Sequence, residues 1–378
     1  MYRDGTWVDE LRCPIPARLC PYADEVQNWL VDWVERIGGP LDAEARVRLA
    51  RGGVARYAGR LYPEATEVDL QVLAALFTWF FLLDDACDAS RRPRPAEVAA
   101  LCDGVLRLLR SQPVAAAGTR PANQPPAAPG TRSPNRPAAR LTSPPPTRSA
   151  NQPAPRPEAF DGPLRRMLAD AWQIPYHRMS VSWRNRFVDA VAHHLDGVVI
   201  EATNKATGRL PSVAEYIALR RATSAAYISY ALIEFATGLP VPDAIYHHPA
   251  VREVAATAND LLSWFNDLLS LDRDAATSGG HNLVLAVARE DGIPIEAAVR
   301  VVVRRWQRSM RRFVELREAV PSFGPALDGP LHEYLEGVAN SVRGTMDWSL
   351  ESGRYRNALP ATRRPGPVVR AERLPGNA

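Results

Sequence analysis

Two acidic patches constrain this chain more than any other feature, because each is joined to residues so apolar that a fold would bury them. The first patch ends the apolar run 70–83, and the second lies in the stretch NDLLSLDRD. Their polar residues are Asp84, Asp85 and Asp88 in the first patch, and Asn266, Asp267, Ser270 and Asp274 in the second. Carboxylates beside apolar surface are costly to bury unless they are paired or bind a metal. The two patches predict hard cations facing an apolar cavity, which suits a diphosphate on a hydrocarbon tail.

The spacing of apolar residues predicts an all-helical chain. Apolar side chains recur at helical spacing along most of the sequence, and no alternation of strands with helices appears. We expect helices over 24–38, 45–63, 69–88, 97–110, 183–206, 212–237, 248–274, 281–291, 294–320 and 330–352, with a further helix from Pro163 onward. The helix over 69–88 is apolar almost all round, which places it at the centre of the bundle.

Residues 113–158 interrupt this pattern with a Pro/Ala/Arg-rich insertion. More than a quarter of the segment is proline, which removes the backbone N–H and clashes with the preceding helical turn. We expect a disordered, partly polyproline II excursion, which is either a tolerated loop or a docking segment for a partner. The chain is therefore predicted to be one domain over 1–358, interrupted by this insertion, with a disordered tail over 359–378.

Composition argues against several classes of protein. The net charge is +4, and much of the excess arginine falls in segments predicted to be unstructured, so nucleic-acid binding is not expected. The N-terminus has no signal-peptide pattern, and the apolar stretch LQVLAALFTWFFLL is shorter than the about 20 residues of a membrane span. We expect a soluble cytoplasmic protein. Its cysteines show no CxxC pair and are predicted to be reduced thiols: Cys13, Cys20, Cys87 and Cys102.

The first patch has the spacing of a metal site at a helix end. Asp84 and Asp88 are four residues apart and share one helix face, where unpaired like charges would repel each other. A divalent cation reverses the sign of that interaction, and Mg²⁺ prefers oxygen ligands. Phe80 and Phe81 lie one turn earlier, with Phe77 before them, so aromatic faces would lie deeper than the carboxylates. The alternative is a solvated helix end above an ordinary aromatic core.

The second patch strengthens the case for a metal. Asn266, Ser270 and Asp274 follow each other at intervals of four residues, a stripe of about 12 Å along one helix face. An amide oxygen, a hydroxyl and a carboxylate in a row suit a hard cation, and Arg273 is placed to meet a phosphate. The residues that flank the stripe are apolar, namely Trp264, Phe265, Leu268, Leu269 and Leu271. A solvated face is again the alternative, but this flank favours a buried helix.

In this order, DDACD and NDLLSLDRD resemble the two metal motifs of bacterial class I terpene synthases (terpene cyclases). The resemblance covers 21–355 and includes LYPEATEVDL, IEATNKATGRLPSVAEYIALRRATS, VREVAATANDLLSWFND and GGHNLVLAVARED. It implies a single helical bundle around a deep apolar cavity, with three Mg²⁺ ions at its mouth. The metal ligands that it implies are Asp84, Asp88, Asn266, Ser270 and Asp274.

The resemblance also assigns residues that bind and sense the diphosphate. LRRATS resembles the helix-break motif of the family, which makes Arg220 the sensor, Thr223 the linker and Ser224 the residue whose carbonyl points at the substrate. SGRYR resembles the Arg-Tyr pair that grips the diphosphate on closure. The implied diphosphate-binding residues are Arg220, Asn266, Arg273, Arg354 and Tyr355.

Two departures from the family are visible. The last acid of the second motif is usually glutamate, whereas Asp274 is one methylene shorter, and the 113–158 insertion is longer than usual. The implied reaction is ionisation of a prenyl diphosphate, followed by cyclisation of the carbocation in a dry pocket. The aromatic candidates for stabilising that cation are Phe80, Phe81 and Trp348, followed by Phe77 and Tyr230. No general acid is needed to start this reaction, so the two histidines of the 183–206 helix, His193 and His194, are expected to be structural.

We therefore expect a Mg²⁺-dependent cyclase that acts on farnesyl diphosphate and releases diphosphate. Geranyl and geranylgeranyl diphosphate stay open as substrates, because cavity depth decides chain length. A chain-elongating prenyl diphosphate synthase would carry a second aspartate-rich motif, which the Asn/Ser/Asp stripe is not. A non-catalytic scaffold and a carrier of prenyl diphosphates remain as alternatives, and a homodimer is also open.

Overall fold

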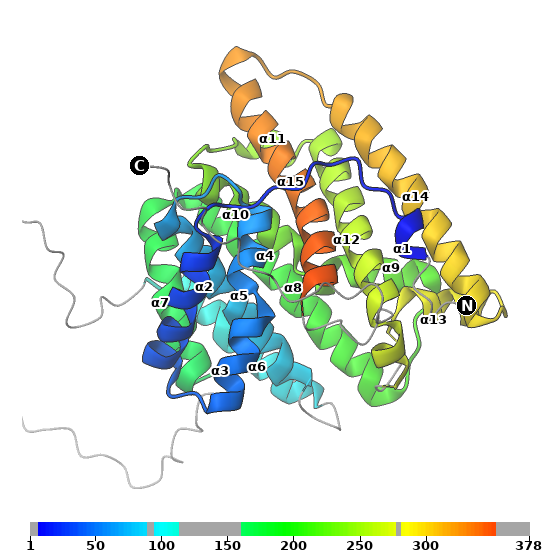
Figure 1. Cartoon of the computed structure of the whole chain (residues 1–378), viewed down its shortest axis with the longest axis horizontal. Coiled ribbons are helices and arrows are strands. Elements are labelled where there is room, and N and C mark those ends of the chain that lie inside the picture. The colour runs from blue at the N-terminus through cyan, green and yellow to red at the C-terminus, as the bar shows by residue number, and fades with distance from the viewer. Residues whose placement is uncertain (1–6, 89–93, 113–159, 277–280, 353–378) are drawn as a thin grey trace, which may run out of the picture.

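A computed structural model describes residues 7–88, 94–112, 160–276 and 281–352, and these form helices without a strand (Figure 1). The first helices are α1 (Trp7–Glu10), α2 (Ala23–Trp33) with a π-helical turn after it (Val34–Gly38), α3 (Ala43–Gly52), α4 (Val54–Leu61), α5 (Glu67–Asp88), α6 (Pro95–Arg110) and α7 (Gly162–Arg178). The others are α8 (Val181–Thr207), α9 (Val213–Thr223), α10 (Ala226–Thr237), α11 (Asp243–Tyr246), α12 (Pro249–Ala276), α13 (Leu283–Glu290), α14 (Ile295–Glu318) and α15 (Pro325–Glu351). The predicted all-helical bundle is confirmed, while the predicted insertion and tail lie outside the described residues.

Helix α5 lies at the centre of the bundle, as its apolar composition predicts. It packs against α2, α4, α7 and α10, and the indole N–H of Trp79 donates a hydrogen bond of 2.8 Å to the carbonyl of Leu164. By length and composition alone, Glu67–Cys87 could cross a membrane. Core helices pass the same test, and this helix is enclosed by its neighbours, so the stretch is weak evidence for a membrane span.

The predicted single helix over 45–63 is wrong, because the chain divides there into α3 and α4. Gly53 separates them with a φ of 61°, a left-handed conformation that glycine adopts without steric cost and that ends helices. The preceding carbonyl, that of Gly52, accepts a hydrogen bond of 3.0 Å from the indole N–H of Trp348. The break therefore brings the start of α4 against the end of α15.

Six helices form a closed circuit around the part of the bundle that holds both acidic patches. Helix α4 packs against α5 and α15, α15 against α12, α12 against α9, and α9 against α8. Phe80 of α5 completes the circuit, since its ring centroid lies 6.3 Å from that of His194 on α8.

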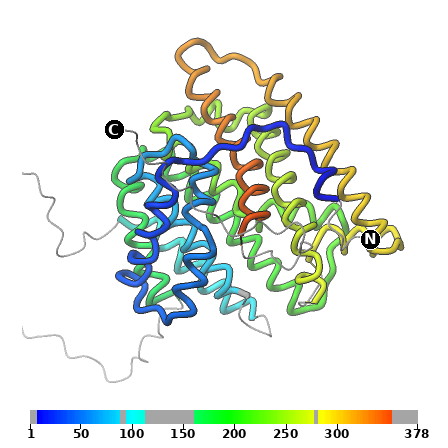
Figure 2. The backbone as a smooth tube through the Cα atoms, in the orientation of Figure 1, coloured from blue at the N-terminus to red at the C-terminus, as the bar shows by residue number. Residues whose placement is uncertain are grey.

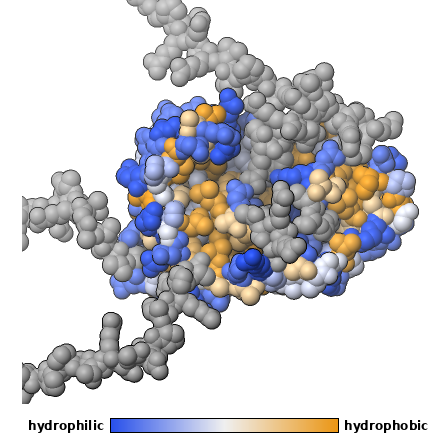
Figure 3. All heavy atoms as spheres, turned by 90° about the horizontal axis from the view of Figure 1, so that it is seen from below, coloured by the Kyte–Doolittle hydropathy of each residue, from blue (hydrophilic) through white to orange (hydrophobic). Residues whose placement is uncertain are grey.

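The C-terminal ends of α5, α12 and α15 all point toward the lower side of the molecule (Figures 1 and 2). Seen from that side, the protein shows an apolar area between polar margins (Figure 3). Because α5 and α12 carry the two patches near these ends, both patches lie on the same side of the molecule.

Candidate active site

The site is built around a break between α9 and α10. The sequence pattern predicts one helix over 212–237, and the structure corrects this to two helices separated by Ser224 and Ala225. Ala225 has a φ of 59° and is the one non-glycine residue with a positive φ in the described part of the chain. A left-handed alanine is strained, so neighbouring groups must hold it. The break begins at Ser224, the last residue of LRRATS, the segment that resembles the helix-break motif.

Helix α8 supports this break from one side. The Nδ1 of His194 lies 3.2 Å from the carbonyl oxygen of Ala222, which can only accept, so Nδ1 carries the proton. Burial lowers the pKa of His194 to about 4, and the imidazole is neutral near pH 7. Gly197, one turn further along α8, lets the helices approach closely, because a Cβ there would lie 2.7 Å from the Cβ of Ala222. The expectation that His194 is structural agrees with this position.

Arg220 joins α9 to the second patch on α12. Its Nε donates a hydrogen bond of 3.0 Å to Oδ1 of Asp267, and its Nη2 donates one of 3.1 Å to Oδ1 of Asn266. Burial disfavours the charged guanidinium, but the charge and hydrogen bond of Asp267, together with nearby Tyr216 and Glu201, raise the pKa of Arg220 above its ordinary value. The structure therefore brings the predicted sensor and the first residue of the second motif into direct contact.

The remaining residues of the second motif line up along α12. The hydroxyl of Ser270 donates to Oδ2 of Asp274, which also accepts a bond of 3.0 Å from Nδ2 of Asn282. Arg273 is half exposed, and its Nε lies 3.2 Å from Oδ1 of Asp274. Amide, hydroxyl and carboxylate oxygens are ligands that Mg²⁺ accepts, so the donor set fits a hard divalent cation. Nowhere in the described ranges do three His, Cys, Asp or Glu side chains gather into a ready metal cluster.

The first motif lies at the C-terminal end of α5. Asp84 and Asp85 are exposed there, while the side chain of Asp88 is outside what the structure describes. One turn earlier, Phe81 stacks on Trp348 with 5.7 Å between ring centroids. Asp84 and Asp85 are therefore exposed, whereas Phe81 is half-buried against Trp348.

An aromatic wall connects α4, α5 and α15. The ring of Tyr57 stacks on Trp348 at 4.4 Å and meets Phe77 edge-on at 5.3 Å, while its hydroxyl lies 3.1 Å from Oγ1 of Thr345. Sequence reasoning missed Tyr57, because nothing in its own stretch marks it and its partners are far along the chain. Tyr230 is fully buried, and its hydroxyl has no hydrogen-bond partner among the described residues.

The two motifs occupy opposite walls of the helical circuit and are linked by contacts. On one side, the ring of Phe80 on α5 faces His194 on α8, and His194 is hydrogen-bonded to the carbonyl of Ala222 on α9. Arg220, two residues before Ala222, is hydrogen-bonded to Asn266 on α12. In the other direction Phe81 reaches Trp348 on α15, and α15 packs against α12. Arg354 and Tyr355 lie just beyond α15, outside the described residues. Sequence reasoning assigned no role to Tyr216 or Asn282 and counted Asp267 only as a member of the second acidic patch, yet these three residues hold this network together.

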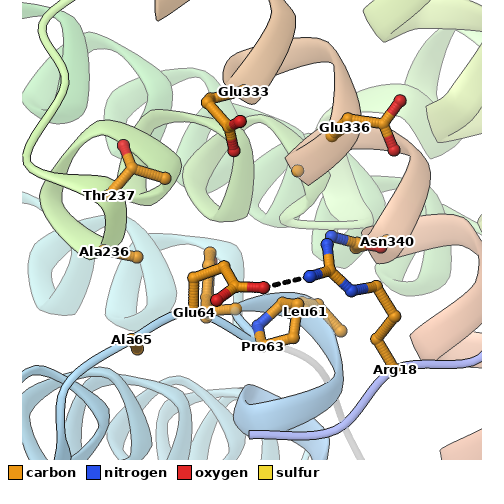
Figure 4. Close-up of a pocket in the computed structure, with 12 residues that line it drawn as sticks. Arg18, Leu61, Pro63, Glu64, Ala65, Ala236, Thr237, Glu333, Glu336 and Asn340 are labelled. Carbon is orange, nitrogen blue, oxygen red and sulfur yellow. Dashed lines mark hydrogen bonds and ion pairs between the residues drawn. The ribbon is translucent and has the colours of Figure 1, made fainter.

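A separate hollow lies near the other end of α5 (Figure 4). Arg18 and Glu64 form an ion pair across it. Along the axis of α5, Glu67 is about 25 Å from Asp84, at 1.5 Å per residue. None of the residues that line this hollow was predicted as a site residue: Arg18, Leu61, Tyr62, Pro63, Glu64, Ala65, Ala236, Thr237, Glu333, Glu336, Gly337 and Asn340.

Comparison with known proteins gives consistent matches. The family model described as Terpene synthase family 2, C-terminal metal binding, matches residues 75–312. Germacrene A synthase of Nostoc punctiforme is 26% identical over 348 residues, covering 92% of this chain and 94% of its own. The (+)-T-muurolol synthase ((2E,6E)-farnesyl diphosphate cyclizing) of Roseiflexus castenholzii is 27% identical over 343 residues, with coverages of 90% and 92%. Linalool/nerolidol synthase from Streptomyces clavuligerus superposes with a TM-score of 0.70 at 25% identity, covering 89% and 99%.

Proposed function

The chain belongs to terpene synthase family 2, whose metal-binding region spans both acidic motifs, and on that premise we propose that it cyclises farnesyl diphosphate. The protein is a terpene synthase, hence a lyase that binds a prenyl diphosphate and a divalent metal. The proposal adds the fifteen-carbon substrate and Mg²⁺ as the ion. The name of the Roseiflexus relative, which specifies farnesyl diphosphate, supports this chain length.

The contact of Arg220 with Asn266 carries the proposal. This hydrogen bond places Arg220, a cation suited to binding diphosphate, beside the second motif, whose oxygens suit the metal. Both lie on the wall of the helical circuit opposite Asp84. When bound, the divalent metal stabilises the negative charge of the leaving diphosphate. The side chains proposed to hold it are Asp84, Asp88, Asn266, Ser270 and Asp274.

The chain's own residues would position and protect the reacting groups. Arg220 meets phosphate oxygens with its planar fork, and Arg273 adds a second cation at the same mouth. Arg354 and Tyr355 are proposed to bind the same diphosphate from the segment after α15. Thr223 and Ser224 lie at the helix break, and the backbone carbonyl of Ser224 is proposed to point at the substrate.

The aromatic wall would stabilise the carbocation after ionisation. Phe81, one turn before Asp84, stacks on Trp348, and Phe80 lies on the neighbouring side of α5. Each aromatic face stabilises a nearby cation by about 0.5–2 kcal/mol and excludes the water that would quench it. Phe77 and Tyr230 are proposed to extend this lining.

Incubation with C10, C15 and C20 diphosphates and Mg²⁺, followed by gas chromatography of the organic extract, tests the proposal. We expect a terpene hydrocarbon or alcohol from the C15 substrate, with loss of product in EDTA. Asn266→Ala and Asp84→Ala should each lower turnover by about 100-fold. Product from the C10 or C20 diphosphate alone would refute the proposal that farnesyl diphosphate is the substrate. Binding without diphosphate release from any substrate would refute catalysis and favour a carrier or scaffold.

Localisation in the cytoplasm and assembly as a homodimer remain predictions. Size-exclusion chromatography with light scattering tests the second.

A further inference from the structure

Asp267 has a role that the two motifs do not explain. Its side chain is only 2% exposed and accepts three hydrogen bonds: 3.0 Å from Nε of Arg220, 2.7 Å from the hydroxyl of Tyr216 and 3.1 Å from the backbone N–H of Leu283. Its backbone carbonyl accepts a fourth, of 2.8 Å, from Nδ2 of Asn282. These donors come from α9 and from the start of α13. The carboxylate is therefore fixed by two helices besides its own.

The contact leaves one particular edge of the Arg220 guanidinium available. Nε and Nη2, which form the side-on edge, are engaged by Asp267 and Asn266. The end-on edge consists of Nη1 and the second hydrogen of Nη2. Nη1 makes no hydrogen bond within the described ranges, and the Arg220 side chain is 17% exposed. Two parallel N–H groups on that edge match two phosphate oxygens.

We propose that Asp267 is a positioning residue, which grips the side-on edge of Arg220 so that the end-on edge faces the diphosphate of the substrate. The inference rests on the proposed function for the identity of that substrate. It assigns Asp267 no contact with the diphosphate or the metal. Tyr216 and the N–H of Leu283 contribute by fixing Asp267, since an arginine side chain alone would sample many rotamers.

The same two helices contain a matched control pair. Arg221 binds Asp260 with two hydrogen bonds of 2.7 Å, and Asp260 is 7% exposed. Like the first pair, this one ties the end of α9 to α12. Asp260 lies seven residues before Asp267, about 10 Å along the helix. Among the described residues, no hydrogen bond or ion pair joins Arg221 or Asp260 to a proposed metal ligand, although the hydroxyl of Ser224 donates a bond of 3.2 Å to the carbonyl of Arg221. If Asp267 only fastened α9 to α12, replacing either aspartate would have the same consequences.

The experiment compares Asp267→Asn with Asp260→Asn in the full chain. Binding of inorganic diphosphate in the presence of Mg²⁺ is measured by isothermal titration calorimetry, together with Tm, kcat and KM for the C15 diphosphate. We expect both variants to lower Tm to a similar extent. Only Asp267→Asn should weaken diphosphate binding, by roughly tenfold, which corresponds to about 1.4 kcal/mol. In the Asp267→Asn background, adding Arg220→Gln should cost less than it does in the wild-type protein.

Equal diphosphate affinity in the two aspartate variants would overturn the proposal, as would full additivity of Asp267→Asn and Arg220→Gln. Absence of diphosphate binding by the wild-type protein would overturn it as well. If Asp267→Asn does not fold, Tyr216→Phe replaces it, because this variant removes one bond to Asp267 and should weaken diphosphate binding while Asp260→Asn does not. If the wild-type protein binds diphosphate but converts no prenyl diphosphate, the proposed function fails while the binding comparison still decides the role of Asp267.

Discussion

Protonation of His194 is predicted to destabilise the fold as the pH falls. The imidazole is buried on α8, and its Nδ1–H donates to the carbonyl of Ala222 at the helix break. Burial lowers its pKa from 6.5 to about 4. Because the folded-state pKa is the lower one, the unfolded chain binds more protons between these values. Stability is therefore unaffected well above pH 6.5, falls as the pH decreases toward 4, and loses no more from this group below that.

The size of the effect follows from the two pKa values. The full difference between the two pKa values corresponds to about 3 kcal/mol, of which about 2 kcal/mol is lost between pH 7.5 and pH 5. Asparagine places an amide N–H near the position of Nδ1 without titrating. We expect urea unfolding of His194→Asn to lose about 2 kcal/mol less than the wild-type protein over this pH interval.

The exposed neighbour His193 provides the control for this measurement. His193→Asn makes the same substitution at an exposed position of α8, and the pH dependence of His194→Asn is compared with that of this variant as well as with that of the wild-type protein. If His194→Asn shows the same loss of stability between pH 7.5 and pH 5 as the wild-type protein, the assignment of a buried, neutral imidazole is wrong.

Three further predictions address packing, the aromatic wall and the insertion. Gly197→Ala should cost about 1–3 kcal/mol of unfolding free energy, because the added Cβ would crowd Ala222. Gly52→Ala, whose Cβ would meet nothing closer than 3.9 Å, should not have this cost. Equal denaturation midpoints of the two variants would contradict this prediction. Tyr57→Leu should lower the rate of cyclised product by roughly 2- to 30-fold relative to Tyr57→Phe, as measured by gas chromatography, unless the ring lies away from the cation. Deleting residues 114–156 should leave turnover largely intact, and loss of turnover in a folded deletion variant would give the insertion a catalytic role.

Local patterns in the sequence predicted most of the helices and placed the two acidic patches on α5 and α12. The run before Asp84 is apolar on all sides, so its central position follows from composition alone. The stripe of Asn266, Ser270 and Asp274 follows from helical periodicity, and the structure keeps it on one side of α12.

Features that depend on distant partners were not predictable in the same way. The break at Ala225 puts a non-glycine residue into a left-handed conformation, which no local propensity favours. Its support comes from α8, where His194 and Gly197 fit against Ala222, and from α12, where Asn259 donates a bond of 2.8 Å to the carbonyl of Arg221. Only the resemblance of LRRATS to a helix-break motif pointed to this position, because periodicity continues across it.

The shorter acid at the end of the second motif can be understood from the same network. An aspartate reaches one methylene less far than a glutamate, so its carboxylate must be held close to the helix to serve the same stripe. Ser270 and Asn282 both donate to Oδ2 of Asp274 and fix it there. Asn282 also caps α13, since its Oδ1 accepts from the N–H of Val284, and it binds the carbonyl of Asp267. One buried amide thus joins the end of α12 to the start of α13 and orients Asp274, the shorter acid that is proposed as a metal ligand.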